Sequence, residues 1–298
     1  MGGSPTDGLV LVDKPSEWTS HDVVARVRRL AGTRKVGHAG TLDPMATGLL
    51  VIGVNRATRL LTYLVGADKV YTATIRLGQG TVTDDAEGET TSAVGAAHVG
   101  PEALTAAVAA LTGDIAQVPS AVSAIKVDGR RSYARVRAGE DVELRAREVT
   151  VHAFEVLSHT PARAVDGTRV LDVQTRVRCT SGTYVRALAR DLGAALGTGG
   201  HLVALRRTEV GPFSVAAART LSQLAESFVL LDVTTALRTV FPTRTLTVEE
   251  TTAVRYGQRI AASGSDDVIA AFDPDARGIA LIQDRGESAQ PVLVLDPA

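Results

Sequence analysis

The sequence predicts an α+β protein with two domains. Its 298 residues are about twice the length of a typical domain. Stretches with the two-residue period of strands and stretches with helical spacing both occur along the chain. The composition changes near Phe241–Pro242, after which only short apolar runs follow. We therefore expect a mixed domain over residues 1–242 and a small β-rich domain over residues 243–298.

The first elements follow from periodicity and end signals. Residues 9–13 (LVLVD) predict a strand, and apolar residues then recur at helical spacing between Ser20, which can cap a helix, and Gly32, which can end it. The segment 35–48, KVGHAGTLDPMATG, has three glycines and a proline, which predicts a loop. A buried strand, LLVIGV, is expected directly after it.

The same criteria place the later elements. In order they are a strand at 71–77, a loop at 78–92, a helix opened by Pro101 and closed by Gly113, strands at 149–157 and 169–179, and a helix from Tyr184 to Leu196. Residues 117–147 have no clear period and are basic. We expect them to form an insertion rather than part of the core.

Several classes of protein are excluded by composition. The single cysteine, Cys179, forms no intrachain disulfide, looks like a core residue at a strand end, and belongs to no zinc-binding Cys/His motif. No apolar stretch reaches the roughly 18 residues of a membrane span, and no secretory signal opens the sequence. Because no coiled coil or apolar interface stripe is evident either, we expect a cytoplasmic monomer.

Charge is unevenly distributed although the net charge is only −1. Seven Lys or Arg stand against four acids in residues 126–147, and six Arg against one acid in residues 176–207. Residues 264–298 hold seven acids and two Arg. A basic face on a near-neutral protein fits phosphate contact, and solvated arginines explain the same counts. Charge alone leaves both interpretations open.

Asp43 is the strongest local candidate for chemistry. It lies in the glycine-rich loop, and Pro44 restricts it to extended backbone angles. A carboxylate held in this way can serve as a nucleophile or a base, or it can cap its own loop in an Asx-turn. His38 lies nearby, but no third residue at suitable spacing completes a metal site.

Two further side chains stand out. Arg186 falls in the first turn of its predicted helix, where the helix dipole disfavours a cation, so it needs a partner such as a carboxylate or a phosphate. Arg190 lies one turn further on the same face and can complete a phosphate clamp with it. Tyr71 lies on the apolar face of its strand, where it either packs in the core or stacks on a nucleobase.

Five segments, read together and in order, closely resemble the TruB family of bacterial tRNA pseudouridine-55 synthases. The segments are VDKPSEWTSHDVVARVRR, GHAGTLDPMATGLL, DKVYTATIRLG with the following TVTDDAEG, QVPSAVSAIKVDGRRSYARVRAG, and RCTSGTYVRALARDLGAALGTGGHLVALRRTEVGPF. The resemblance implies a pseudouridine synthase fold, with a mixed, largely antiparallel sheet flanked by helices. It also implies an RNA-binding thumb at 117–147 and a PUA-like domain at 243–298.

The implied activity is isomerisation of the uridine at position 55 in the tRNA T loop, by an aspartate nucleophile and base flipping. The resemblance assigns the nucleophile to Asp43 and the arginine that pairs with it to Arg186. It assigns to Tyr71 the ring that stacks on the target base and makes Tyr71 the candidate for proton transfer. It implies no metal, nucleotide or other cofactor, and the T arm of tRNA as partner. The implied substrate- or RNA-binding residues are Lys14, His38, Gly40, Thr41, Lys126, Arg130, Arg131, Tyr133, Arg135, Tyr184, Leu205 and Arg206.

Two departures from the family pattern matter. Glu17–Trp18 stands where family members often carry glycine, which bears on the local turn. The acidic end of the chain repels phosphate at low salt, so we expect it to contribute weakly to RNA binding, with only Arg244, Arg255 and Arg259 available. Two alternatives stay open: a synthase of this fold that acts on another RNA, and a tRNA-binding or tRNA-folding protein whose catalysis is secondary.

Overall fold

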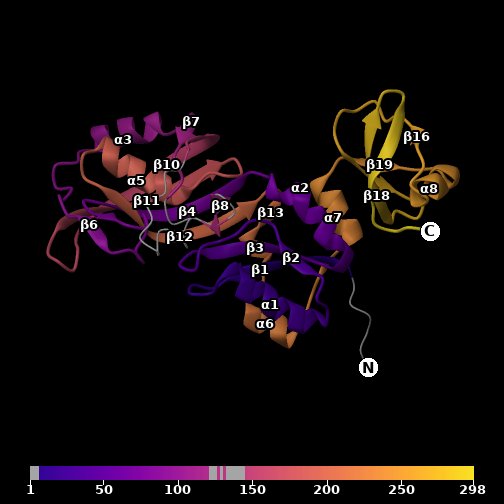
Figure 1. Cartoon of the computed structure of the whole chain (residues 1–298), viewed down its shortest axis with the longest axis horizontal. Helices are drawn as coiled ribbons and strands as arrows, with labels where there is room; N and C mark the ends of the chain where they lie inside the picture. The colour runs from indigo at the N-terminus through magenta and orange to yellow at the C-terminus, as the bar shows by residue number, and fades with distance from the viewer. Residues whose placement is uncertain (1–6, 121–125, 128–129, 132–144) are drawn as a thin grey trace. The chain divides into compact units, whose positions relative to one another are not determined.

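A computed structural model describes residues 7–120, 126–127, 130–131 and 145–298 (Figure 1). The chain divides into two compact units. Unit 1 comprises Met1–Pro44, Gly48–Val65 and Gly211–Ala298, and unit 2 comprises Met45–Thr47 and Gly66–Val210. The predicted boundary between residues 242 and 243 falls inside unit 1 and stays a prediction of the sequence.

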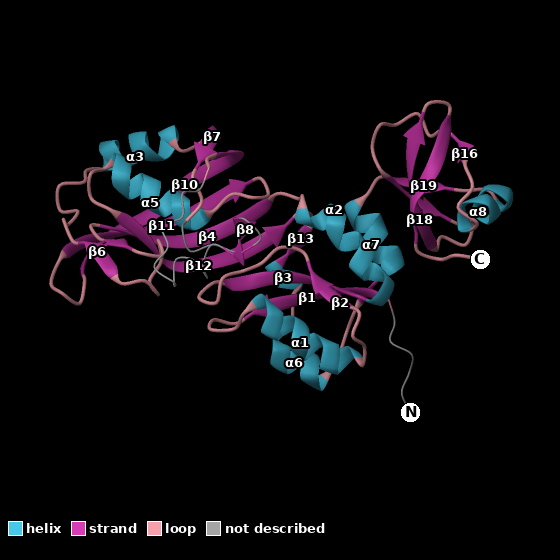
Figure 2. Cartoon of the chain, in the orientation of Figure 1, coloured by secondary structure: helices cyan, strands magenta, loops and turns pink. Residues whose placement is uncertain are grey.

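Unit 1 contains paired strands covered by helices. The elements before the C-terminal region are β1 Gly8–Lys14, α1 Ser20–Ala31, β2 Val36–His38, β3 Thr47–Val54, η1 Asn55–Leu60, α2 Leu61–Val65, β13 Phe213–Ser214, η2 Val215–Ala217, α6 Leu221–Glu226, β14 Leu231–Asp232 and α7 Val233–Val240. β1 pairs antiparallel with β3 and β14, and β2 pairs antiparallel with β3. Helices α1 and α6 lie side by side next to these strands (Figure 2). Valines of α1 and Leu224 of α6 share one buried cluster with residues of β1 and β3.

The first helix begins one residue away from the expected cap. Thr19, not Ser20, is the N-cap, and it forms a capping box with Asp22. Gly32 ends the helix in the left-handed conformation at φ 64, as predicted. The prediction for Ser20 was wrong because its hydroxyl has a distant partner, described below.

The C-terminal part of unit 1 is a five-stranded sheet in the order β15-β17-β18-β19-β16. Its elements are β15 Thr243–Thr245, α8 Val248–Arg255, β16 Ile260–Ala261, β17 Ile269–Phe272, β18 Gly278–Arg285 and β19 Ser288–Val294. β15 and β17 run parallel, and the other pairs are antiparallel. Val254 of α8 is buried among residues of these strands. The expected small β-rich end of the chain is confirmed.

Unit 2 is built on long antiparallel strands in the order β12-β4-β11-β10-β7. Its elements are β4 Lys69–Leu77, β5 Gly80–Thr81, β6 Thr90–Ser92, α3 Pro101–Ala110, β7 Gly113–Gln117, β8 Lys126–Val127, β9 Arg130–Arg131, β10 Arg147–Arg163, β11 Arg169–Cys179, α5 Val185–Ala195 and β12 Gly200–Val210. Helices α3 and α5 lie together over one face of the sheet (Figure 1). The expected largely antiparallel sheet flanked by helices is confirmed.

Three local predictions need correction. The loop at 35–48 contains the short strand β2, and the loop at 78–92 contains the paired strands β5 and β6. Gly113 does not close helix α3, which ends at Ala110, but begins strand β7 with φ 97. Short strands without a repeated apolar period give a local sequence signal too weak to distinguish them from loop.

Candidate active site

The loop that carries Asp43 is held by a buried lysine. Lys14, the last residue of β1, is fully buried. Its ammonium donates to the carbonyl oxygens of Pro15 at 2.9 Å, Trp18 at 2.6 Å and Pro44 at 3.1 Å. Carbonyl partners compensate the desolvation of the buried cation. In the structure Lys14 fixes the peptide that follows Asp43, and its expected role in binding substrate or RNA stays a prediction.

A second set of bonds fixes the residue before Asp43. The buried Ser20 hydroxyl donates to the Leu42 carbonyl at 3.0 Å and accepts from the Leu42 amide at 2.9 Å. The amide of Glu17 donates to the Pro44 carbonyl at 2.9 Å. Asp43 is half-buried between two anchored residues. Its backbone is therefore constrained from both sides, as the sequence predicted from Pro44 alone.

The other predicted residues of this loop lie on the same stretch of unit 1. His38 ends β2, is half-buried, and packs edge-on against His21 with ring centroids 5.8 Å apart. Gly40 is half-buried and has φ 93, a conformation that favours glycine. Thr41 is exposed. Gly40 and Thr41 therefore lead directly into the anchored segment.

In unit 2, strand pairing gathers the predicted apolar site residues on one face. Tyr71 of β4 lies opposite Arg207 of β12, and Ala73 lies opposite Leu205. Residues at i and i+2 of a strand share a face, so Tyr71, Leu205 and Arg207 are neighbours there. Tyr71 and Leu205 are each 8% exposed. Core packing of Tyr71, one of the two sequence interpretations, is thus present in the structure.

Cys179 ends β11 opposite Lys69 of β4. Burial raises the pKa of its thiol to about 11. The side chain is 1% exposed. The prediction that Cys179 is a core residue is confirmed, and its thiol stays protonated near neutral pH.

Arg186 at the beginning of α5 has a carboxylate partner, as its position in the helix required. Its Nη1 lies 3.4 Å from Oδ2 of Asp85 and donates to the Thr83 carbonyl at 2.9 Å. Both ionic side chains are nearly inaccessible, at 6% and 4% exposure. Oδ1 of Asp85 accepts from the Thr83 hydroxyl and the Glu87 amide, which fixes the carboxylate. Pairing of Arg186 with Asp43 stays a prediction of the resemblance.

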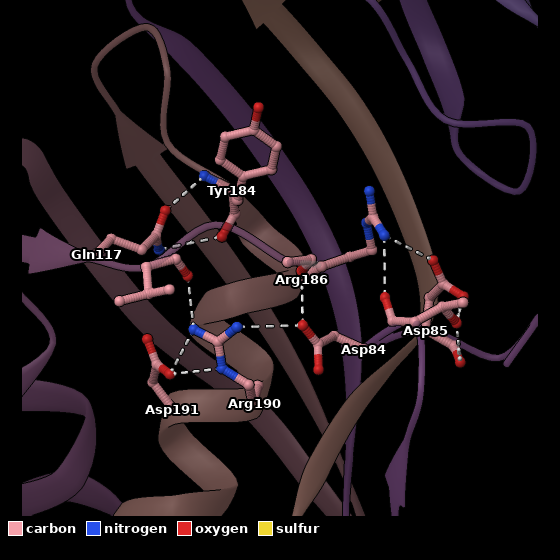
Figure 3. A network of polar contacts seen from close by, with 10 residues as sticks. Asp84, Asp85, Gln117, Tyr184, Arg186, Arg190 and Asp191 are labelled. Atoms are coloured by element: carbon pink, nitrogen blue, oxygen red, sulfur yellow. Dashed lines mark hydrogen bonds and ion pairs between the residues drawn. The ribbon is translucent and has the colours of Figure 1, made fainter. Parts of the chain in front are cut away.

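Arg190 has partners within unit 2, and the phosphate clamp that it could form with Arg186 stays a prediction. Its guanidinium contacts Asp84 at 3.3 Å and Asp191 at 2.9 Å, and donates to the Val118 carbonyl at 2.7 Å (Figure 3). These bonds join parts of unit 2 to one another. The backbone of Tyr184 exchanges two hydrogen bonds with the Gln117 side chain, while its ring points away from these ion pairs (Figure 3).

The remaining predicted RNA-binding residues lie on β12 or in the basic insertion. Arg206 is half-buried and its guanidinium lies 3.4 Å from the Thr47 hydroxyl. Strands β8 and β9 pair Lys126 with Arg131 and Val127 with Arg130. Tyr133 and Arg135 lie outside the described residues. Among the residues that are described, no group of three His, Cys, Asp or Glu is arranged as metal ligands would be.

Sequence reasoning missed two residues of this region. Asp85 was not selected because its partner Arg186 is about a hundred positions away in the chain. Arg207 is 1% exposed. The sequence prediction selected its neighbour Arg206 as an RNA-binding residue and did not select Arg207. Strand alternation from Leu205 was the available signal, since it places residue 207 and not 206 on the face of Leu205.

Family comparisons match nearly the whole chain. Residues 28–185 match the TruB family pseudouridylate synthase N-terminal domain. Residues 186–244 match the tRNA pseudouridylate synthase B C-terminal domain. Residues 241–296 match tRNA pseudouridine synthase II, C terminal.

The chain matches curated relatives over nearly their full length. The tRNA pseudouridine synthase B of Paenarthrobacter aurescens strain TC1 is 61% identical over 97% of this chain and 95% of its own. The protein of the same name from Thermobifida fusca strain YX is 58% identical over 97% of this chain and 98% of its own. That of Mycobacterium leprae strain TN is 56% identical over 97% of this chain and 91% of its own.

Solved structures share the fold. A chain of a Cbf5-Nop10-Gar1 complex is 25% identical and superposes with a TM-score of 0.73 over 99% of this chain and 86% of that chain. A chain of an H/ACA RNP bound to a substrate RNA containing 2′-deoxyuridine is 24% identical, with a TM-score of 0.72 over 97% and 85%. The fold and the matches define the class: the protein is a pseudouridine synthase, an RNA-modifying isomerase. The chain belongs to the TruB family of tRNA pseudouridine synthases.

Proposed function

We propose that this chain converts uridine 55 in the T loop of tRNA to pseudouridine, with Asp43 as the nucleophile. The observation that carries the proposal is the anchoring of the residues on both sides of Asp43 by Lys14 and Ser20. A nucleophile is effective when its position is fixed before the substrate arrives, because the entropy of orientation is then already lost. The names of the relatives support tRNA as the substrate.

The reaction is an isomerisation, so its atoms balance without a co-reactant. The bond from N1 of uracil to C1′ of the ribose breaks, the ring turns, and a bond from C5 to C1′ forms. The proton on C5 is lost and N1 gains one. The first step is an attack by Asp43 on the ribose, an attack on C6 of the base, or a deprotonation of the ribose, and each needs an ionised carboxylate.

We assign Tyr71 and Arg186 the roles that the family resemblance implies. A uridine inside a folded loop must be flipped out, at a cost of a few kcal/mol. Stacking on the Tyr71 ring offsets part of that cost. A nearby guanidinium keeps a carboxylate ionised, which is the role proposed for Arg186 toward Asp43. Its bonds to Asp85 and Thr83 hold that guanidinium in place.

The basic insertion at 117–147 supplies the proposed grip on the T arm. Lys and Arg bind phosphates without regard to sequence, and RNA is recognised mainly by shape and by splayed bases.

None of the helices that the structure describes combines the length and apolar character needed to cross a membrane. We expect the protein to act as a monomer in the cytoplasm on free tRNA.

The test is incubation of the purified protein with an unmodified T-arm stem-loop RNA, without metal or nucleotide, followed by mapping of pseudouridine at base resolution. We expect conversion of the T-loop uridine alone. Asp43→Asn keeps the shape of the side chain and removes its charge, so we expect the rate to fall by roughly 10⁴-fold or more while RNA binding persists.

The outcomes separate the alternatives. Pseudouridine formed by the Asp43→Asn variant would remove Asp43 from the chemistry. Binding without conversion by the natural chain would favour another RNA substrate or a protein that mainly binds tRNA. Loss of both binding and conversion would contradict the assignment of the insertion as the RNA grip.

A further inference from the structure

We propose that Asp84 and Arg190 are positioning residues that fix the first residues of the insertion, 117–120, against helix α5. The proposal rests on the proposed function, because the insertion is the segment expected to grip the tRNA. It concerns contacts within unit 2 only. The proposal gives Asp84 and Arg190 a structural task that is separate from the chemistry.

Two neighbouring acids pair with two arginines one helical turn apart. Asp85 faces Arg186, and Asp84 faces Arg190 with 3.3 Å between Oδ2 and Nη1 (Figure 3). Residues at i and i+4 lie on one face of a helix, so both arginines point to the same short segment. The Asp84–Arg190 pair is therefore a separate ion pair that lies beside the Asp85–Arg186 pair.

The Asp84–Arg190 pair also holds the beginning of the insertion. The Ser120 hydroxyl, fully buried, donates to Oδ2 of Asp84 at 2.6 Å. Nη2 of Arg190 donates to the Val118 carbonyl at 2.7 Å. Each member of the ion pair thus binds one residue at the point where the chain leaves β7. The nearly buried Gln117 side chain adds two bonds to the Tyr184 backbone.

The backbone of Asp84 suits this role. Its φ is 61, in the left-handed region that aspartate and asparagine tolerate better than most residues. Its carbonyl accepts from the Leu202 amide at 3.0 Å, which ties it to β12. Burial raises the pKa of the Asp84 carboxyl, and its bond to Ser120 and the two arginines oppose that rise. The charged form of the Asp84 carboxyl is therefore stabilised by Ser120 and the two arginines.

The experiment measures RNA binding and catalysis separately in the full-length Asp84→Asn variant. Asparagine keeps the backbone preference and the size of the side chain, removes the charge and replaces one acceptor oxygen by an amide donor. We expect the Kd for the T-arm stem-loop and the KM to rise roughly tenfold, the effect of losing one charge-assisted bond. We expect kcat to stay within about twofold. Amide hydrogen exchange at Gln117, Val118 and Ser120 should accelerate by a similar factor.

Matched variants separate positioning from a general loss of structure. Asp191→Asn removes the other carboxylate on Arg190, which lies on the same helix, and should leave the Kd unchanged. Ser120→Ala should weaken RNA binding, as Asp84→Asn does. The loss of binding free energy in the double variant should be clearly smaller than the sum of the two single losses. Arg190→Lys keeps the positive charge, so it should lose less affinity than Arg190→Met.

Three results would overturn the proposal. One is a fall in kcat with KM unchanged in Asp84→Asn, which would make Asp84 a residue acting through Arg186. Another is an equal effect of Asp191→Asn. The third is faster exchange spread over β4 and β11 instead of residues 117–120. The exchange measurement needs no turnover, so the proposal is judged even if the natural chain makes no pseudouridine.

Discussion

Glu17 occupies a backbone conformation that most side chains avoid. Its φ is 67, its side chain is exposed, and its amide donates to the Pro44 carbonyl beside Asp43. A left-handed residue other than glycine costs roughly 1–2 kcal/mol. Family members often have glycine in this turn. In this chain Glu17 adopts the left-handed conformation instead, and the turn is strained.

We predict opposite effects from two substitutions at this position. Glu17→Gly relieves the strain but adds freedom to the unfolded chain, so the free energy of unfolding should rise by about 0 to 1 kcal/mol. Glu17→Val, with a β-branched side chain, should lower it by about 1–2 kcal/mol. Urea unfolding of the three proteins measures both changes. Equal stability of the glycine and valine variants would contradict the strain.

Lys69 gives a pH dependence with a definite sign. It is 6% exposed, and burial, followed by the charge of Arg207, lowers its pKa to about 8. Between about pH 8 and 10.5 the unfolded chain holds a proton that the folded chain has released. Stability rises with pH wherever the unfolded state binds more protons.

We therefore expect the natural chain to gain about 2 kcal/mol relative to Lys69→Met between pH 8 and 10, and nothing between pH 6 and 7. The quantity to measure is the difference in the free energy of unfolding between the two proteins at each pH. Titrating groups that do not interact with Lys69 cancel in that difference. A flat difference would mean that Lys69 keeps a normal pKa when folded.

Sequence reasoning at this scale succeeded where the cause was local. Pro44 and the glycines identified the Asp43 loop, and the dipole argument required a partner for Arg186, such as a carboxylate or a phosphate. It failed where the partner was distant: Ser20 was taken for a helix cap because its partner Leu42 is 22 positions away, in another element. Asp85 was missed for the same reason.

At the scale of elements, α5 and β12 pack through glycines. A side chain at Gly200 would collide with the Ala189 carbonyl in α5, and one at Gly193 would collide with the backbone of Gly199 and Gly200. Helix and strand thus approach more closely than side chains allow. This contact holds the helix that carries Arg186 and Arg190 against the strand that carries Leu205 and Arg207.

We predict that Gly200→Ala lowers the free energy of unfolding by about 2–4 kcal/mol, because the backbone must move to admit the methyl group. Gly66→Ala is the matched control in the same unit, since nothing lies within 4 Å of its added carbon and its φ is not left-handed. We expect it to change stability by less than about 0.5 kcal/mol. Similar effects of both substitutions in urea unfolding would contradict close packing.

The long elements were predictable because each carries several periods of its pattern. The strands at 149–157 and 169–179 and the helix at 184–196 were confirmed, although β10 extends from Arg147 to Arg163. Short elements such as β2, β5 and β14 span two or three residues. These short strands form because a neighbouring strand offers backbone hydrogen-bond partners. A local sequence pattern does not predict such pairing.

At the scale of the whole molecule, the acidic end of the chain pairs some of its own arginines. Arg244 pairs with Glu250 at 2.6 Å, and Arg255 pairs with Asp296 at 2.7 Å. Arg259 is exposed. Two of the three arginines proposed for a contact with RNA are thus engaged with acids of their own region. This supports the expectation of a weak contribution to RNA binding.

We predict that neutralising four exposed acids hardly changes RNA affinity. The substitutions are Asp266→Asn, Asp267→Asn, Asp275→Asn and Glu287→Gln, all at exposed positions. At each salt concentration between 50 and 200 mM, the Kd of this variant for the T-arm stem-loop should differ from that of the natural chain by less than about twofold. As a contrast, Arg145→Gln with Arg147→Gln in the insertion should weaken binding and reduce the salt slope by about 2. Much tighter binding after the acid substitutions would place RNA next to this region.

Unit 1 is assembled from three separate stretches of chain, and this sets the order in which a ribosome can complete it. β1 emerges first, yet one of its neighbours, β14, and the Leu224 that closes its core are among the last third to be translated. At roughly 5–20 residues per second, that interval is on the order of 10–40 s. Unit 2 is complete earlier. The Asp43 loop therefore gains its lasting support only when synthesis is nearly over, and until then β1 is an open strand edge that a chaperone can cover.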